Sequence, residues 1–135
     1  MIIHKPLFKE IVILAVVVAF LHKMALSFHL YWSVWWFDIL LHFLGGVTIG
    51  VIALFVFFTS GYIKYPSRHQ IVVLSIVLGS VFIVGLVWEL WELFAGFSNV
   101  IEDCGDTITD LVVDLIGAVT AYFYGRSYTI KISKD

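Results

Sequence analysis

Four long apolar stretches occupy most of this 135-residue chain and constrain its fold more than any other feature. They run from about residue 7 to 30, 37 to 58, 71 to 94 and 107 to 124. Each has close to the roughly 20 residues that a helix needs to cross the hydrocarbon core of a bilayer. A helix also satisfies its own backbone hydrogen bonds there, which an open strand cannot do. The sequence therefore predicts an all-α fold: a single transmembrane domain, residues 1–135, built as a bundle of four transmembrane helices.

The composition excludes the other common classes of protein. The chain is 61% hydrophobic and 13% charged, with a mean hydropathy of +1.03. A soluble domain of this size must cover a large surface with polar side chains, and this chain has too few of them. One cysteine cannot form a disulfide framework, and a net charge of -2 offers no basic surface for nucleic acid. We therefore expect membrane lipids, and no nucleic acid, as partners.

The basic residues predict the orientation of the bundle. All lysines and arginines except Lys23 fall on one side of it, and basic loops stay in the cytoplasm. The five tryptophans gather at the opposite interface, in agreement with this topology. We expect cytoplasmic N- and C-termini in the plasma or inner membrane. The first stretch resembles a signal peptide, but no small-residue cleavage site follows it, so we expect an uncleaved anchor.

The acidic residues gather in the outer half of the predicted bundle. Of ten carboxylates, only Glu10 and Asp135 are expected in the cytoplasm. The others lie near the start of the second stretch, the end of the third and the start of the fourth, which meet at one level in an antiparallel bundle. An ionised Asp near the bilayer centre costs roughly 2.5–3.5 kcal/mol. Because basic residues are scarce there, bound protons, water or a cation must compensate the charge.

Helical spacing places these side chains on shared faces. Residues three or four apart project from one side of a helix. Carboxylates with one imidazole suit a divalent metal such as Mg, Mn, Fe or Zn. We predict a metal site facing outside, with Glu92 as its catalytic base. The predicted metal ligands are Asp38, His42, Glu89, Asp106, Asp110 and Asp114.

Simpler interpretations exist for several of these residues. Asp38 or Asp106 can cap a helix, and Glu92 can be solvated at the membrane interface. Neither applies to Asp114, which lies about 12 Å along the helix from Asp106 and near the bilayer middle. His22 and His29, seven residues apart on the first stretch, could face the site, but such residues are more often interfacial and are left out of it. Whether the first stretch contributes to the site stays open.

Three motifs, in order, resemble those of the VanZ-like family of small bacterial membrane proteins. Segment 38–43 (DILLHF) resembles the Asp-Lys-x-x-His-Phe motif, 89–92 (ELWE) a Glu-x-x-Gln/Glu motif, and 110–117 (DLVVDLIG) an Asp-x-x-x-Asn-x-x-Gly motif. Asp114 stands in place of Asn and Ile39 in place of Lys. The chain is equally similar to a related group of uncharacterised inner-membrane proteins. The VanZ-like resemblance implies the fold, the site and an association with glycopeptide (teicoplanin) resistance.

Three functions are compatible with this pattern. A bound metal activates water and polarises a phosphoryl or acyl oxygen, which predicts a hydrolase or transferase acting on lipid or lipid-linked headgroups. Alternatively, the acids form the relay of a proton- or cation-coupled transporter. In a third interpretation the protein is not catalytic and its protonated acids join the helices. The oligomeric state is left open.

Overall fold

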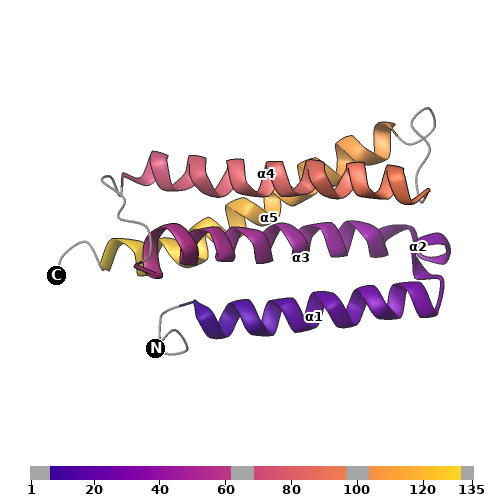
Figure 1. The fold of residues 1–135 in the computed structure, drawn as a ribbon, viewed down its shortest axis with the longest axis horizontal. Coiled ribbons are helices and arrows are strands. Elements are labelled where there is room, and N and C mark those ends of the chain that lie inside the picture. The colour runs from indigo at the N-terminus through magenta and orange to yellow at the C-terminus, as the bar shows by residue number, and fades with distance from the viewer. Residues whose placement is uncertain (1–6, 62–68, 97–103, 132–135) are drawn as a thin grey trace.

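The computed structural model describes residues 7–61, 69–96 and 104–131, and every regular element in these ranges is helical (Figure 1). Four helical segments are long and apolar enough to cross a membrane, which confirms the all-α bundle of four transmembrane helices. The side of the membrane that each end faces stays a prediction. The elements are α1 (Phe8–Ser27), α2 (Leu30–Ser33), α3 (Trp35–Leu54), the π-helical η1 (Phe55–Thr59), α4 (Gln70–Ala95) and α5 (Cys104–Lys131).

The helix bounds differ from the predicted spans mainly at the two ends of the chain. The first span was predicted to reach residue 30, but the helix ends at Ser27 and His29 adopts a left-handed φ of 54°. This conformation turns the chain into the short α2 instead of continuing α1. The last helix extends from Cys104 to Lys131, beyond the predicted 107–124 at both ends. Hydropathy marks the part of a helix that lipid surrounds, whereas its hydrogen bonds continue into polar residues. The predicted loops at 59–70 and 95–106 fall largely outside the described residues.

Helix α3 lies at the centre of the bundle, between α1 and α4, and α5 crosses obliquely behind them (Figure 1). The most extensive packing of α3 is against α5. Helix α1 begins, and α5 ends, at one end of the bundle (Figure 1). The start of α3 and the end of α4, which carry predicted site residues, lie at the other end.

Small residues allow α3 and α5 to approach closely. A Cβ added at Gly117 would lie 2.4 Å from the carbonyl oxygen of Phe43, and one at Gly50 would lie 2.6 Å from Cβ of Ala121. In lipid there is little hydrophobic gain from joining helices, so close packing of this kind stabilises a membrane bundle. The register of these glycines therefore fixes which residues of α3 and α5 face each other.

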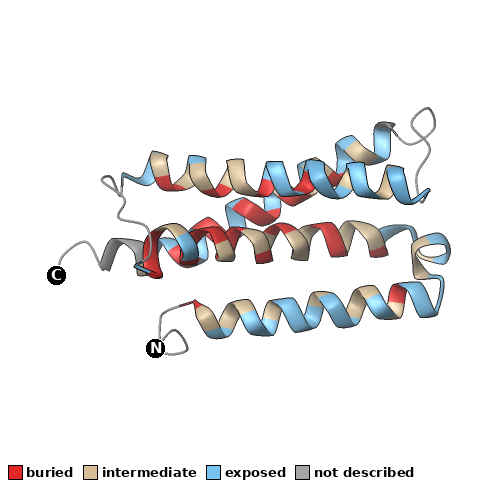
Figure 2. Ribbon diagram, in the orientation of Figure 1, coloured by how far each residue is buried: buried red, intermediate tan, exposed pale blue. Residues whose placement is uncertain are grey.

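The buried core lies along α3, α4 and α5, and α1 is the least buried of the long helices (Figure 2). Large apolar side chains on the outside, such as Ile13 and Ile83, are what a lipid-facing surface requires. A smaller buried cluster, Ala25, Phe37 and Leu41, lies where α1 ends and α3 begins. The larger one occupies the half of the bundle away from the acids. It consists of Leu7, Val51, Leu54, Phe55, Phe58, Val73, Val77, Val81, Ala118, Ala121 and Tyr122.

Candidate functional site

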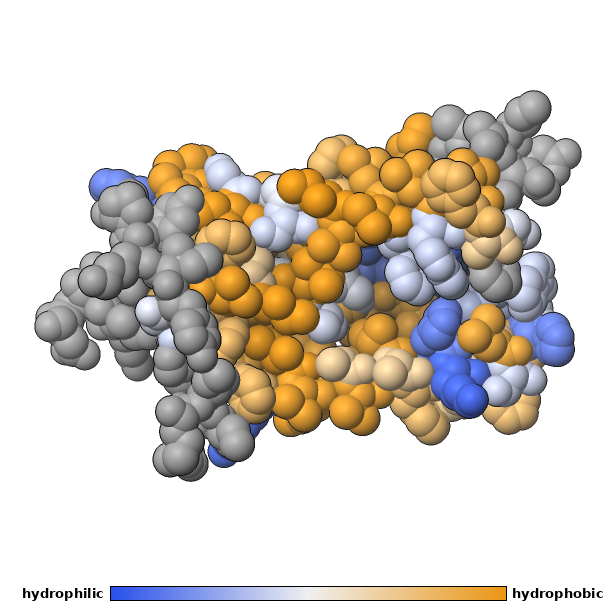
Figure 3. Space-filling model, viewed as in Figure 1, coloured by the Kyte–Doolittle hydropathy of each residue, from blue (hydrophilic) through white to orange (hydrophobic). Residues whose placement is uncertain are grey.

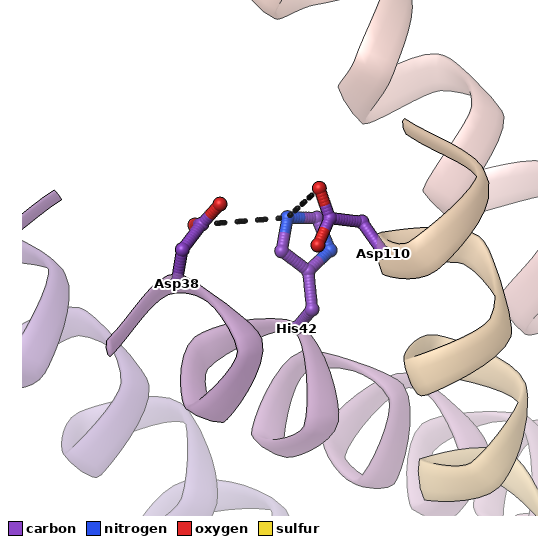
Figure 4. A group of neighbouring side chains, drawn as sticks. All are labelled: Asp38, His42 and Asp110. Atoms are coloured by element: carbon purple, nitrogen blue, oxygen red, sulfur yellow. Dashed lines mark ion pairs between the residues drawn. The ribbon is translucent and has the colours of Figure 1, made fainter. Parts of the chain in front are cut away.

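His42 lies at the centre of the acidic cluster. Its Nε2 atom is 3.9 Å from Oδ1 of Asp38 and 3.8 Å from Oδ2 of Asp110. Its Nδ1 atom is 3.4 Å from Oδ1 of Asp114. Asp38 and Asp110 approach the ring from α3 and α5 (Figure 4). His42, Asp110 and Asp114 are only 7%, 3% and 6% exposed. One buried imidazole is thus shared among three carboxylates from two helices.

Two glycines create the space for Asp114. A Cβ at Gly46 of α3 would lie 2.2 Å from the backbone oxygen of Asp114, so only glycine lets the α5 backbone come this close. A Cβ at Gly85 of α4 would lie 2.7 Å from Oδ2 of the same residue. The carboxylate of Asp114 therefore fills a gap left by a missing side chain on α4, and its position is fixed from both sides.

Two glutamates of α4 approach the same imidazole, and each accepts a hydrogen bond. The hydroxyl of Thr107 donates to Oε2 of Glu89 over 2.8 Å, and the indole N–H of Trp88 donates to Oε1 of Glu92 over 2.9 Å. Thr107 belongs to α5, so the first bond joins two helices. Both glutamates are held by neighbours and are not simply solvated at the end of α4.

Side-chain nitrogen and oxygen atoms of the cluster lie close enough together to hold a metal ion. In two sets, Asp38 with His42 and Asp110, and His42 with Glu89 and Glu92, one nitrogen or oxygen of each residue lies within 4.8 Å of the others. Ligands on opposite sides of an ion, at about 2.0–2.6 Å from it, are themselves about 4–5 Å apart. The donors, one imidazole and several carboxylate oxygens, fit a divalent cation.

Two carboxylate oxygens of the cluster have no hydrogen-bond partner among the described residues. They are Oδ1 of Asp110 and Oε1 of Glu89, and both are buried. Buried polar atoms are almost always hydrogen-bonded, and a buried unpaired carboxylate oxygen is especially unfavourable. These two atoms are free to bind a ligand that carries positive charge or a donor.

A cavity of about 220 Å³ opens beside the cluster, between α1, α3 and α4. Its polar end is lined by Asp38, His42, Glu92 and Asp114, and also by His22 of α1 and Tyr31 of α2. Figure 3 shows a hollow on this face of the molecule, with hydrophilic surface at depth among hydrophobic side chains. The first span therefore contributes to the lining of the site.

His22 and Tyr31 are not among the residues that the sequence motifs predict for the site. The Tyr31 hydroxyl is hydrogen-bonded to Nδ1 of His22, and the His22 ring meets Trp88 edge-on, with centroids 5.9 Å apart. Burial raises the pKa of Tyr31, and the nearby charges of Asp38 and Glu92 raise it further. The sequence gives no signal for this neighbourhood, because the turn at His29 that brings Tyr31 back to His22 contains no glycine or proline.

The predicted ligands do not all occupy equivalent places. Asp38, His42, Glu89 and Asp110 belong to the two sets of atoms close enough to share an ion. Asp114 meets the opposite nitrogen of the ring. Glu92, predicted as the base, lies within the second set and lines the cavity. Asp106 is exposed on the first turn of α5 and belongs to neither set.

Comparison with known proteins gives the family. Residues 3–131 match the family described as Predicted membrane protein (DUF2238). The chain belongs to this family. The match covers all four membrane-spanning helices and agrees with the fold described above. No curated protein and no solved structure matches the chain. The more specific VanZ-like resemblance stays a prediction.

Proposed function

We propose that this member of the DUF2238 family is a metal-dependent membrane enzyme acting on lipid headgroups. Its divalent cation is held by Nε2 of His42 and by the carboxylates of Asp38 and Asp110. These atoms converge from two helices, and their spacing suits one ion. The VanZ-like resemblance of the three motifs, which include all three residues, is part of this proposal.

The buried, unpartnered oxygen of Asp110 is the observation that carries the proposal. Asp110 is 3% exposed, and its Oδ1 has no hydrogen-bond partner among the described residues. Among the described residues, Asp110 forms an ion pair with His42, whose ring also lies beside the carboxylates of Asp38 and Asp114. A divalent cation supplies the missing positive charge and a coordination partner for the free oxygen.

Asp114 orients the ring and is not a ligand in this proposal. A metal-binding histidine usually directs its second ring nitrogen to a carboxylate, which fixes the tautomer and strengthens the ligand. Oδ1 of Asp114 lies beside Nδ1, on the opposite edge of the ring from Asp38 and Asp110. This assigns different roles to two aspartates one helical turn apart.

The glutamates of α4 complete the proposed chemistry. A bound metal lowers the pKa of a coordinated water and polarises a phosphoryl or acyl oxygen. Glu92 lines the cavity next to the metal ligands, and Trp88 holds one of its oxygens, so Glu92 is the proposed general base. Glu89, bonded to Thr107, has a buried oxygen free for the metal or its water.

The transporter alternative has less support from the packing. A relay needs polar groups leading from the acids to the other end of the bundle. Among the described residues, that half is filled by the apolar core around Val51, Val77 and Ala121. The buried hydroxyls of Thr48, Thr59 and Ser60 each donate to the backbone carbonyl four residues earlier in the chain.

Metal analysis of the purified protein tests the proposal. Wild-type protein in detergent, incubated with Mg, Mn, Fe or Zn and then freed of unbound metal, is expected to retain about one ion per chain by mass spectrometry. Asp110→Asn is expected to lose it. Asp106→Asn is the matched control, because it removes an exposed carboxylate from the same helix one turn away. If wild type binds no metal, or both variants lose it equally, the proposed site is wrong.

A second experiment tests the enzymatic part. The metal-loaded protein is given lipid phosphates and lipid esters in mixed micelles, and release of phosphate or fatty acid is measured. Wild type is expected to turn over one of these classes, and Glu92→Gln to bind metal but turn over substrate much more slowly. A Glu92→Gln variant as active as wild type would remove this residue from the mechanism.

A further inference from the structure

We infer that the cavity beside the cluster binds one hydrocarbon chain of a membrane amphiphile, which enters sideways between α1 and α4 with its headgroup at the cluster. This deepens the proposed function, on which it rests for the identity of the headgroup site. The shape, lining and position of the cavity support the chain site itself.

The polarity of the cavity changes along its length. At one end lie His22, Tyr31 and Glu92, and the carboxylate of Asp114 reaches the lining further along, beside Gly85. Beyond it the lining becomes Ile49, faced by Val18 of α1, and the hydroxyl of Thr48 there already donates to the carbonyl of Leu44. Val81 and Val84 of α4 complete the apolar end. The polar end is the end at which α3 begins and α4 terminates, so the apolar end points toward the middle of the membrane. A lipid in one leaflet is arranged in the same way, with its polar headgroup at the membrane surface and its apolar chain toward the middle.

The length of the cavity agrees with half a bilayer. From Asp38 to Ile49, both of which line it, α3 rises about 16 Å at roughly 1.5 Å per residue. Half of a hydrocarbon core of about 30 Å is about 15 Å. A headgroup beside Asp38 would therefore place its chain alongside α3 at the depth that the chain occupies in the surrounding lipid.

Water is a poor occupant of the apolar end. Cavities lined only by apolar side chains stay dry and take up hydrocarbon. Side chains such as Val18, Ile49 and Val81 offer water no hydrogen bonds, and an empty space would forfeit their dispersion contacts. A hydrocarbon chain makes those contacts, and lipid surrounds the bundle at this depth.

The packing leaves a side entrance for the chain. Helix α1 packs on α2 and α3, and its contact with α4 in the described residues is slight. His22 and Trp88, whose rings meet edge-on, bridge the two helices at the polar end. The hollow in Figure 3 lies on the side of the bundle, between α1 and α4, and not at its end. An amphiphile can thus reach the cluster directly from the surrounding lipid, without leaving the membrane.

Two glycines allow a matched test of the chain site. Gly45 lines the cavity, and a Cβ added there meets nothing within 4 Å, so Gly45→Leu fills the chain site without a clash at its Cβ. Gly79 of α4 is also half-buried and also has open space at its Cβ, but it does not line the cavity. Gly79→Leu therefore makes the same chemical change away from the proposed site.

The probe is an alkyl phosphate whose long chain carries a photoreactive diazirine near its end. Protein in phosphatidylcholine nanodiscs is irradiated with it, and labelled peptides are mapped by mass spectrometry. Wild type is expected to be labelled around Ile49 and Val81, with labelling suppressed by excess unlabelled alkyl phosphate. Gly45→Leu should reduce this labelling several-fold, and Gly79→Leu should leave it unchanged. Equal labelling in wild type and Gly45→Leu, or labelling confined to lipid-facing positions such as Val16, would overturn the inference.

Metal content measured on the same samples separates this inference from the proposed function. Gly45→Leu is expected to keep its metal while losing the labelling, because the variant fills only the chain site. Specific labelling in a protein that binds no metal would support the chain site and refute the metal centre. Bound metal without specific labelling would support the metal centre and refute the chain site.

Discussion

Oδ1 of Asp114 lies 3.4 Å from Nδ1 of His42, whereas Asp38 and Asp110 both lie beside Nε2 on the other edge of the ring. Carboxylates therefore approach both edges of the ring, and the proposed function gives those on the two edges different roles. Gly46 and Gly85 leave the space that Asp114 occupies, since a Cβ at either would collide with it. An orienting carboxylate needs only to accept a hydrogen bond, whereas a metal ligand needs its charge as well. This difference can be measured.

We predict that Asp114→Asn keeps most of the metal affinity, because an amide oxygen of nearly the same shape can still accept from Nδ1. Asp114→Ala should bind metal about 10–100-fold more weakly, the usual effect of losing an orienting partner. Dissociation constants from competition with a fluorescent chelator check both values. If Asp114→Asn loses metal as completely as Asp110→Asn, Asp114 is a ligand and the division of roles is wrong.

The close approach of α3 and α5 gives a prediction about stability. A Cβ at Gly117 would lie 2.4 Å from the carbonyl oxygen of Phe43, which is backbone and cannot move aside alone. We expect Gly117→Ala to lower the free energy of unfolding by about 1–3 kcal/mol, the usual cost of overpacking. Reversible unfolding in mixed micelles with increasing SDS measures the change.

Gly79→Ala is the control for this prediction, since its Cβ meets no atom within 4 Å. Replacing a helical glycine with alanine there should leave the stability unchanged or raise it by up to about 1 kcal/mol through helix propensity. Equal losses in both variants would mean that the glycines matter for the helix itself and not for the contact between α3 and α5.

Hydropathy and helical spacing were sufficient to predict the four helices and the meeting of the acids. Length and apolar content define a membrane helix almost by themselves, because lipid leaves the backbone no alternative. The spacing from Asp38 to His42 and from Asp110 to Asp114 placed each pair on one face. The family match and the helices confirm a membrane protein of this fold.

The depth and role of each site residue could not be predicted in the same way. Asp106 continues the four-residue spacing of α5 but is exposed, because a helix rotates about 40° over each such step and its first turn lies at the end of the bundle. The position of His22 in the lining of the cavity depends on how α1 packs against α3 and on the reversal of the chain at His29. Both are tertiary features, and they leave no periodic signal in the sequence.

Thr107 is predicted to position Glu89 for binding. Its hydroxyl donates to Oε2 of Glu89 across the contact between α4 and α5, while Oε1 is left free. Thr107→Val keeps the shape but removes the donor, so the free carboxylate should become mobile and metal affinity or turnover should fall about 10–100-fold. Isothermal titration with the metal and a turnover assay give the two values.

Thr109→Val serves as the comparison for Thr107→Val, because the Thr109 hydroxyl is exposed and donates to the carbonyl of Gly105 on its own helix. This variant should bind metal as wild type does. A loss of affinity of the same size in both variants would show that valine near the start of α5 disturbs the helix, and Thr107 would then have no particular role toward Glu89.

The raised pKa of Tyr31 predicts how stability changes at high pH. Burial, with Asp38 and Glu92 nearby, raises the pKa of this phenol above its ordinary value of 10.0, so the folded protein holds the proton more tightly than the unfolded chain does. The corresponding stabilisation is complete below about pH 10 and decreases as the pH rises from there toward the folded-state pKa. Tyr31→Phe has no such proton. Between pH 9 and pH 11, Tm should therefore fall further in wild type than in Tyr31→Phe, because the other tyrosines and the lysines titrate alike in both proteins. The same decrease in Tm in both proteins would mean that the Tyr31 phenol ionises at its ordinary pKa and is not enclosed with His22 at the polar end of the cavity.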